Sequence, residues 1–289
     1  MQRLCRMILT NINSLGLAIY YKKKDALLGA KLLLEGTTQE SWPPDFSHWW
    51  ENNHASINHQ VSFFSERGIR FTHLGATDYP PGLAANLDSP PLWLTYEGDP
   101  KWDREKQLAV VGSRKISALT KSWIQEELFS FLQKVSVCVL SGGARGVDQA
   151  AHFCAMRAHR PTYVILPSGL MEVYPKELYE WKQEILQRGG CFLSEYWPDV
   201  KIQKHFFIQR NRLLAAMADA VLVVQGEKRS GTMLTAQWAI DLGRDIGVVP
   251  GHPMDSSFSG NLGLIRSGVT PIVDQIDLFC MMSAKGKTN

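Results

Sequence analysis

Short aliphatic and β-branched runs recur at regular intervals after about residue 66, each followed by Gly, Ser or Pro and a segment of helical length. The runs are Leu108–Val111, Val137–Leu140, Tyr163–Leu166, Phe192–Leu193, Val221–Val224 and Ile246–Val249. Apolar strands that alternate with helices are typical of strands buried on both faces, in a mostly parallel sheet with right-handed crossovers. We therefore predict an α/β fold of the Rossmann-like, doubly wound type.

Residues 1–65 show a different pattern, and we predict that they form a small helical N-terminal region ahead of a Rossmann-like domain at 66–289. Helix-like runs cover Asp25–Leu34 and Trp49–Phe64. Tryptophans 42, 49 and 50 are interpreted as core residues, since aromatic residues in a small helical unit are more often buried than part of a binding face.

The segment between Arg6 and Lys22 carries no charge, but polar residues interrupt it and no small-residue cleavage site follows. This pattern predicts a packed helix rather than a signal peptide. No other stretch has the apolar length of a membrane span. We expect a cytoplasmic protein without a membrane segment.

The composition excludes some classes of protein. The chain has 289 residues, of which 45% are hydrophobic and 20% charged, so a disordered or low-complexity protein is not expected. The 31 basic and 28 acidic residues give a net charge of +3, too small to indicate a polyanionic partner without further evidence. The cysteines are odd in number and widely spaced, and predict neither a disulfide framework nor a metal site: Cys5, Cys138, Cys154, Cys191 and Cys280.

Glycine-rich polar loops follow three of the predicted strands. They are Gly112-Ser113-Arg114, Ser141-Gly142-Gly143 and Ser230-Gly231-Thr232. Open parallel sheets bind ligands beyond the carboxyl ends of their strands, and the free N–H groups of a glycine loop at a helix start attract anions. Each loop alone is equally compatible with a tight turn. Together they favour a phosphate-binding edge.

Two familiar nucleotide-binding loops are not supported by the spacing. The loop 141–146 lacks the GxGxxG pattern, and no acidic residue stands at a ribose-binding position. The loop 226–231 has Walker-like spacing, but Thr232 occupies the position of the required lysine. We expect neither a dinucleotide cofactor nor ATPase activity, and no cofactor at all.

A cationic stretch follows the strand at 192–193. Between residues 201 and 229, two anions accompany six cations: Lys201, Lys204, Arg210, Arg212, Lys228 and Arg229. Cations suit phosphates, and the aromatic pair Phe206-Phe207 suits unstacked bases. The alternative is a solvated cationic turn with buried phenylalanines. Residues 210 and 212 point to nearly opposite faces of a helix, so at most one of these arginines is expected to reach the same ligand.

Residues from about Tyr79 to Phe279 resemble the DNA-processing protein A (DprA/Smf) family. The matches run in order through Tyr79-Pro80, Pro90-Pro91-Leu92, Val111–Arg114, Ser141–Asp148, Ala151-His152, Gly169, Tyr174-Pro175, Ser194–Tyr196, Phe207, Arg210–Arg212, Ser230–Thr232, Thr235-Ala236, Pro250-Gly251, Gly260-Asn261, Leu264-Ile265 and Gly268.

The resemblance implies a non-catalytic, homodimeric, single-stranded DNA-binding protein of natural transformation (competence), DNA processing and recombination. It implies that the protein protects incoming strands and helps load the RecA recombinase. The chain ends soon after Phe279, so we expect no C-terminal winged-helix-like domain of the kind many members have, and residues 1–65 lack a clear helix-hairpin-helix pattern.

The resemblance assigns DNA contacts to Arg114, to the loop 141–143, to Lys204 and to Phe207, with Phe206 as the close alternative. Combined with the loops and cations above, the expected DNA-binding residues are Gly112, Ser113, Arg114, Ser141, Gly142, Gly143, Arg145, Lys204, Phe206, Phe207, Arg210, Ser230, Gly231 and Thr232.

A different class of function stays open, namely a nucleotide monophosphate-binding enzyme that uses the same crevice. Rossmann-like phosphoribohydrolases carry a Gly-Gly-x-Gly-Thr-x-x-Glu loop, and Gly231-Thr232 resembles its centre. Thr235, however, stands at the glutamate position, which removes an acid/base candidate. The remaining acid/base pair, Asp148 with His152, has helical spacing and is interpreted as a helix-stabilising contact.

Overall fold

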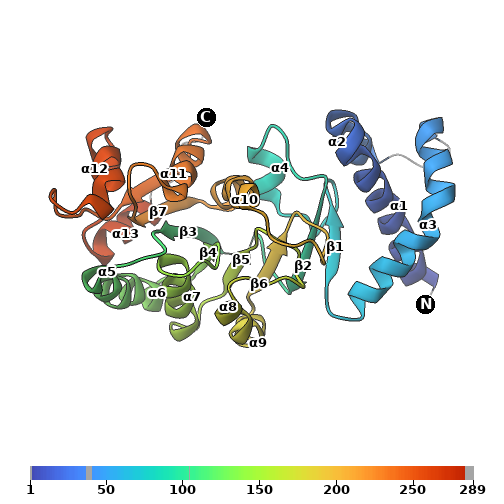
Figure 1. The fold of residues 1–289 in the computed structure, drawn as a ribbon. Helices are drawn as coiled ribbons and strands as arrows, with labels where there is room; N and C mark the ends of the chain where they lie inside the picture. The colour runs from blue at the N-terminus through green and yellow to red at the C-terminus, as the bar shows by residue number, and fades with distance from the viewer. Residues whose placement is uncertain (1, 37–40, 104, 284–289) are drawn as a thin grey trace.

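A computed structural model describes residues 2–36, 41–103 and 105–283, except for the side chains of residues 2–11 and 23. Within these residues the strands form one nine-stranded sheet in the order β1-β2-β6-β5-β4-β3-β7-β8-β9, with helices on both of its faces (Figure 1). The strands are β1 Arg70–His73, β2 Trp93–Gly98, β3 Lys106–Gly112, β4 Val137–Ser141, β5 Thr162–Ile165, β6 Cys191–Ser194, β7 Ala220–Gln225, β8 Asp245–Val248 and β9 Thr270–Pro271.

The helices fall into an N-terminal group and a group that surrounds the sheet (Figure 1). The N-terminal group is α1 Gln2–Lys24, α2 Ala26–Glu35 and α3 Pro44–Ser65. The others are α4 Pro81–Asn86, α5 Ala118–Trp123, the single π turn η2 Ile124–Leu128, α6 Phe129–Lys134, α7 Val147–Arg157, α8 Lys176–Glu180, α9 Lys182–Gln187, α10 Lys204–Met217, α11 Gly231–Asp241, the short 3₁₀ turn η3 Ser256–Phe258, α12 Ser259–Arg266 and α13 Gln275–Ser283.

All six strands predicted from the apolar runs are present, and they pair in parallel as β3 to β8. This confirms the predicted α/β class and the mostly parallel sheet. β1, β2 and β9 were not predicted. β1 and β2 extend the sheet in antiparallel pairing beside β6, and polar residues such as Thr72, Thr95 and Glu97 interrupt the apolar pattern that marks the other strands.

Strand β3 lies at the centre of the core because it is buried on both faces. Leu108 and Val110 pack with residues of η2, α6 and α7, whereas Ala109 and Val111 pack with residues of α10 and α11. Successive residues of a strand point to opposite faces, so an uninterrupted apolar run is required wherever helices cover both sides. The fully buried thiols of Cys138 and Cys154 belong to this core, on opposite faces; the side chain of Cys5 lies outside the described residues.

The N-terminal helices have the boundaries that local chemistry favours. Asp25 caps α2, and its carboxylate accepts a hydrogen bond from the N–H of Leu28 at 3.0 Å.

In α3, Trp50 is buried and its ring stacks on Phe46, while Trp49 is half-buried against Tyr20. The interpretation as a core residue is confirmed for Trp50, whereas Trp42 and Trp49 are partly buried against the core. Among the described helices we find none with the length and apolarity to cross a bilayer.

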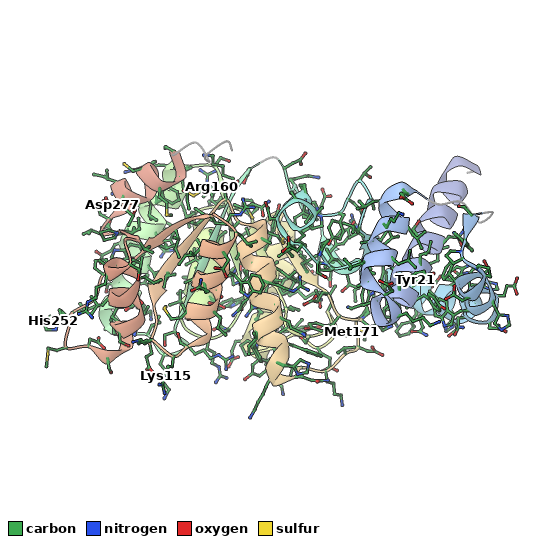
Figure 2. All side chains as sticks on the ribbon, turned by 90° about the horizontal axis from the view of Figure 1, so that it is seen from above. Tyr21, Lys115, Arg160, Met171, His252 and Asp277 are labelled. Carbon is green, nitrogen blue, oxygen red and sulfur yellow. The ribbon has the colours of Figure 1, made fainter. Side chains whose placement is uncertain are left out.

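The loops after the parallel strands emerge on one edge of the molecule. Figure 2 shows Lys115, Met171 and His252, which follow β3, β5 and β8, along one edge, with Arg160, just before β5, at the opposite edge. The chain continues from β3 through β4, β5 and β6 on one side, and then returns to β7 on the other side of β3. This reversal of strand order opens a crevice between the ends of β3 and β7, where doubly wound sheets place their ligands.

Candidate nucleic-acid interface

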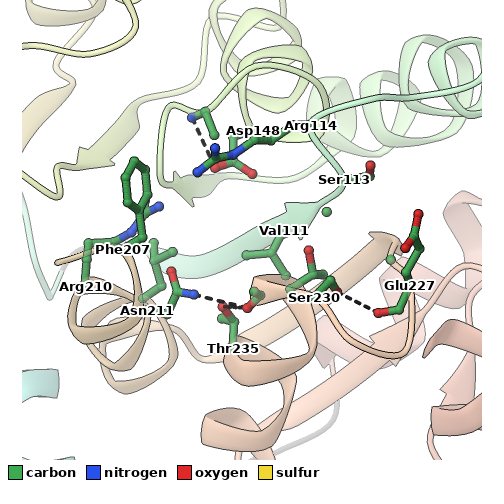
Figure 3. A pocket seen from close by; sticks show the side chains of 16 residues that line it. Val111, Ser113, Arg114, Asp148, Phe207, Arg210, Asn211, Glu227, Ser230 and Thr235 are labelled. Carbon is green, nitrogen blue, oxygen red and sulfur yellow. Dashed lines mark hydrogen bonds between the residues drawn. The ribbon is translucent and has the colours of Figure 1, made fainter. Parts of the chain in front are cut away.

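A cavity of about 350 Å³ occupies this crevice between the carboxyl ends of β3 and β7 (Figure 3). Segments from five places in the chain meet there: the end of β3, the start of α7, the first half of α10, the loop after β7 and the start of α11. The lining residues are Val111, Gly112, Ser113, Arg114, Ala144, Asp148, Phe207, Arg210, Asn211, Leu214, Gly226, Glu227, Ser230, Gly231, Thr232 and Thr235.

Arg114 and Phe207 meet beside this cavity. The Arg114 guanidinium carbon lies 4.7 Å from the centroid of the Phe207 ring, a cation–π contact between the loop after β3 and the first turn of α10. Arg114 is exposed and Phe207 is half-buried. A cation and an aromatic face are therefore presented together at a solvent-accessible position.

Arg210 supplies a second, buried cation. Its side chain is 4% exposed, and its Nη1 donates a hydrogen bond to the carbonyl of Ile165 at 2.9 Å. Its Nε has no hydrogen-bond partner among the described residues. Burial lowers the pKa of Arg210 to about 10, and the nearby Asp148 carboxylate opposes that change, so the group stays charged at neutral pH. A buried donor without a partner suits an anion that enters the cavity.

Gly142 makes room for this arginine. A Cβ at Gly142 would overlap the Arg210 guanidinium, so no other residue type fits without moving it. The glycine of this loop therefore serves the placement of Arg210.

Asp148, in the first turn of α7, is the buried anion of the cavity. Its carboxylate accepts a hydrogen bond from the N–H of Ala144 at 3.3 Å. Burial raises the pKa of Asp148, and Arg210 partly offsets the rise. In Figure 3 Asp148 and Arg114 lie on one side of the pocket, and Asn211 and Thr235 lie on the other.

The N-terminus of α11 forms the wall opposite Asp148. Ser230 precedes this 11-residue helix, and its hydroxyl donates to the carbonyl of Glu227 at 2.7 Å. Asn211 of α10 donates from its side-chain amide to the carbonyl of Gly231 at 3.2 Å, which ties the two helices together. The first N–H groups of a helix have no partners within the helix, so this end of α11 is suited to an anion.

Known proteins resemble this chain in sequence and in fold. The sequence model of the DNA recombination-mediator protein A family matches residues 70–283. The chain belongs to this family. The protein Smf of Borreliella burgdorferi is 33% identical over 212 residues, which are 73% of this chain and 66% of that protein. The chain therefore spans slightly less than two thirds of the length of this relative.

Two solved structures share the fold of the family. The X-ray structure of DNA processing protein A from Streptococcus pneumoniae superposes with a TM-score of 0.73 at 24% identity, and covers 93% of this chain and 92% of its own. The DNA processing protein A of Helicobacter pylori, described for its single-stranded DNA binding mode, has a TM-score of 0.65 at 29% identity, and covers 74% and 95%.

The crevice of this family member brings together eight of the residues singled out in the sequence. They are Gly112, Ser113, Arg114, Phe207, Arg210, Ser230, Gly231 and Thr232. These come from two loops that are far apart in the sequence, one after β3 and one at the start of α11, and from α10. Their meeting at one edge follows from the parallel strand arrangement.

Four predicted residues of the loop after β4 lie outside the cavity lining, namely Ser141, Gly142, Gly143 and Arg145. Ser141 is fully buried and its hydroxyl donates to the carbonyl of Val110 at 2.6 Å, so a side-chain contact from Ser141 to DNA is wrong. Gly143 packs under Leu178 with a positive φ of 75°. Arg145 is exposed and forms an ion pair with Glu177 at 2.6 Å.

The two phenylalanines of α10 differ in position. Phe206 is 8% exposed, and its ring stacks on Tyr196 with centroids 3.9 Å apart, so the prediction that Phe206 faces the ligand is wrong. Phe207 lines the crevice instead. Lys204, exposed at the start of α10, lies one turn before Phe207 on the same side of the helix.

Arg210 and Arg212 separate as the helical spacing predicts. Arg212 pairs with Glu195, which lies just after β6 and is itself buried. Only Arg210 lines the crevice. The same helical periodicity that separates these arginines gives Arg212 a structural role.

The predicted contact between Asp148 and His152 is wrong. His152 is fully buried, and its Nδ1 lies 2.7 Å from the Thr162 hydroxyl, whereas Asp148 bonds to the Ala144 N–H. Sequence reasoning also missed Asn211 and the role of Asp148. A signal for Asn211 was present, because its amide stands next to Arg210, whereas Asp148 was interpreted only as a partner of His152.

Proposed function

We propose that this protein binds single-stranded DNA at the crevice between β3 and β7. Phosphates lie against Arg114, Lys204 and the N-terminus of α11, and a base contacts the ring of Phe207. The observation that carries the proposal is the pairing of the Arg114 guanidinium with Phe207 at 4.7 Å beside a cavity whose buried arginine has an unpartnered Nε. Cation and ring together are what an unpaired strand requires. The single-stranded DNA binding described for the Helicobacter pylori relative supports the same assignment.

Binding rather than catalysis is the proposed activity. At the position where phosphoribohydrolases carry a glutamate, Thr235 is buried and its hydroxyl points back to the carbonyl of Gly231 at 3.5 Å. Asp148, the buried carboxylate that interacts with Arg210, accepts a hydrogen bond from the Ala144 N–H. Neither arrangement resembles a pair of groups poised to cleave a glycosidic bond.

The family context suggests the wider role. We propose that the protein acts in natural transformation and DNA processing in the cytoplasm, where it protects incoming strands and helps load the RecA recombinase as a homodimer. Residues 66–289 would supply the DNA site, with residues 1–65 as an accessory helical region. These roles rest on family membership rather than on a particular contact.

Fluorescence anisotropy of a labelled single-stranded oligonucleotide at two salt concentrations tests the binding proposal. We expect salt-sensitive binding that unlabelled duplex competes for weakly and nucleoside monophosphates do not abolish. Equal affinity for duplex and single strand contradicts the proposal. Chromatography of the same samples detects any free base released from nucleoside monophosphates. Such release identifies a nucleotide hydrolase instead.

A further inference from the structure

A second cavity, also of about 350 Å³, lies where the N-terminal helices meet the end of the sheet. Helices α1 and α3 form one side of it, and β2 with the segment after β6 forms the other. The lining residues are Ile19, Lys22, Trp49, Asn53, Ser56, Ile57, Gln60, Trp93 and Trp197. Its volume is at the lower end of the range for small-ligand pockets, which suits a planar group rather than a large molecule.

The chemistry of this lining is that of a site for a base. Trp49 and Trp197 are half-buried and line the cavity, so part of each ring is available for stacking. Asn53 donates to the carbonyl of Trp49 at 2.7 Å and Gln60 donates to the Ser56 hydroxyl at 3.3 Å. Each amide keeps a second N–H and a carbonyl oxygen that can bond to the edge of a base. Aromatic faces with adaptable polar groups are the usual means of holding an unstacked base.

A cation stands at the edge of this aromatic group. The Lys22 ammonium lies 4.5 Å from the centroid of the Trp93 ring and 5.9 Å from that of Tyr196, and it donates to the carbonyl of Glu195 at 2.8 Å. Lys22 as a whole residue is exposed, while burial among these groups lowers the pKa of its ammonium. A phosphate that approaches this side of the cavity therefore meets a positive charge held in place by the rings.

An unpartnered donor lies in the same wall. Trp93 is 5% exposed, and its indole N–H has no hydrogen-bond partner among the described residues. The indole N–H of Trp197, in contrast, donates to Gln60 at 3.0 Å. Buried polar groups in folded proteins are nearly always paired, so the Trp93 N–H is an unsatisfied donor in this wall.

The second cavity lies on the same edge of the sheet as the crevice. Tyr196 and Trp197 follow β6 at its carboxyl end, and Trp93 begins the antiparallel strand β2 at that end. The stack of Tyr196 on Phe206 joins them to the start of α10, next to Phe207. Four strand spacings of about 4.8 Å separate β3 from β2, or roughly 19 Å, a length that a short single strand can span.

We propose that the second cavity binds a nucleobase of the same DNA strand, which runs from the crevice across Tyr196 to the N-terminal helices. The base stacks against Trp49 and Trp197, and its phosphate contacts Lys22. This inference rests on the proposed function and extends it, because it gives residues of α1 and α3 a direct role in DNA binding.

The test measures affinity against strand length. Labelled oligothymidylates of about 4, 8, 12 and 16 nucleotides cover the site sizes of single-stranded DNA-binding folds. We expect the affinity to rise in a step once a strand bound in the crevice reaches the second cavity. The variant Ser56→Trp fills the cavity and is expected to abolish the step, with a loss of roughly tenfold for long strands and none for the shortest. Ala55→Trp, at an exposed neighbouring position outside the lining, is the matched control and keeps the step.

A charge variant provides an independent measurement if the filled cavity disturbs folding. Lys22→Gln is expected to lower the salt dependence for long strands only, while Lys31→Gln, an exposed lysine of α2 outside the cavity, leaves it unchanged. If affinity depends on strand length in the same way for Ser56→Trp and Ala55→Trp, and both proteins are folded, this inference is overturned. The proposed DNA binding at the crevice is then unaffected. Absence of binding by strands of every length overturns the proposed function and this inference with it.

Discussion

The guanidinium of Arg114 and the ring of Phe207 lie in contact beside the crevice, 4.7 Å from carbon to centroid, although 93 positions separate them in the sequence. The loop after β3 carries the arginine, and the first turn of α10 carries the ring. Each group holds the other in place, so their effects on DNA binding are predicted to be coupled.

Arg114→Ala is expected to weaken single-stranded DNA binding about tenfold and to reduce the salt slope by about 0.7, because one phosphate contact is lost. Anisotropy titrations at several salt concentrations measure both quantities. Lys115→Ala is the control, since it removes the same charge at the next, exposed position, which does not line the crevice. Equal losses in the two variants contradict a specific role for Arg114.

Replacement of the two neighbouring phenylalanines separates binding from stability. Phe207→Ala is expected to weaken binding by about 1–3 kcal/mol with little change in salt slope, because stacking displaces few counterions. Phe206→Ala is expected to lower the free energy of unfolding by about 3 kcal/mol, since Phe206 is buried against Tyr196. Urea unfolding and anisotropy on both variants are the measurements. A destabilised fold in Phe207→Ala, together with a loss of binding but not of stability in Phe206→Ala, contradicts the structure.

A methyl group at Gly142 is predicted to displace Arg210. Gly142→Ala places its Cβ where the guanidinium lies, so we expect a loss of about 1–3 kcal/mol in unfolding free energy together with weaker DNA binding. Gly263→Ala is the matched control, because a Cβ on this helical glycine meets no atom within 4 Å. The control is expected to be as stable as the parent or more stable, by up to about 1 kcal/mol. Thermal and urea unfolding test both variants.

His152 is predicted to make folding sensitive to acid. The Thr162 hydroxyl donates to the carbonyl of Val139, so it accepts from Nδ1–H of His152, and Nε2 is left unprotonated and without a partner among the described residues. Burial, with a contribution from Arg210, lowers the pKa of His152 to about 3. In the unfolded chain the imidazole has a pKa near 6.5.

Between these two values the unfolded chain binds the additional proton. The contribution of neutral His152 to stability is therefore complete above about pH 6.5 and is lost as the pH falls toward about 3. At pH 5 the loss is about 2 kcal/mol relative to pH 7. Urea unfolding at both pH values is expected to show a smaller pH dependence for His152→Gln. A dependence as large as that of the parent contradicts this account.

The parallel sheet was predictable because burial on both faces requires continuous apolar runs, and runs such as Val137–Leu140 stand out in the sequence. The start of α2 was predictable from the helix-like run that begins at Asp25, which is the residue that caps the helix in the structure. The glycine loops were identifiable as candidates because parallel strands bring their carboxyl ends to one edge.

The direction of each side chain at that edge depended on tertiary packing. Nothing local distinguishes Phe206 from Phe207, yet Tyr196 covers the first and leaves the second at the crevice. Ser141 looks like a phosphate-binding serine, but its hydroxyl is taken by the carbonyl of Val110 in the neighbouring strand. Both outcomes depend on residues distant in the sequence.

The sequence by itself determined the layer structure, the edge at which ligands bind and the candidate loops, because periodicity and turn residues act over a few positions. Only the tertiary structure decided which cations are free, which are paired and where two cavities open. Those properties depend on contacts between residues far apart in the sequence, such as Arg210 with Gly142 or Lys22 with Trp93. No local sequence pattern encodes such contacts.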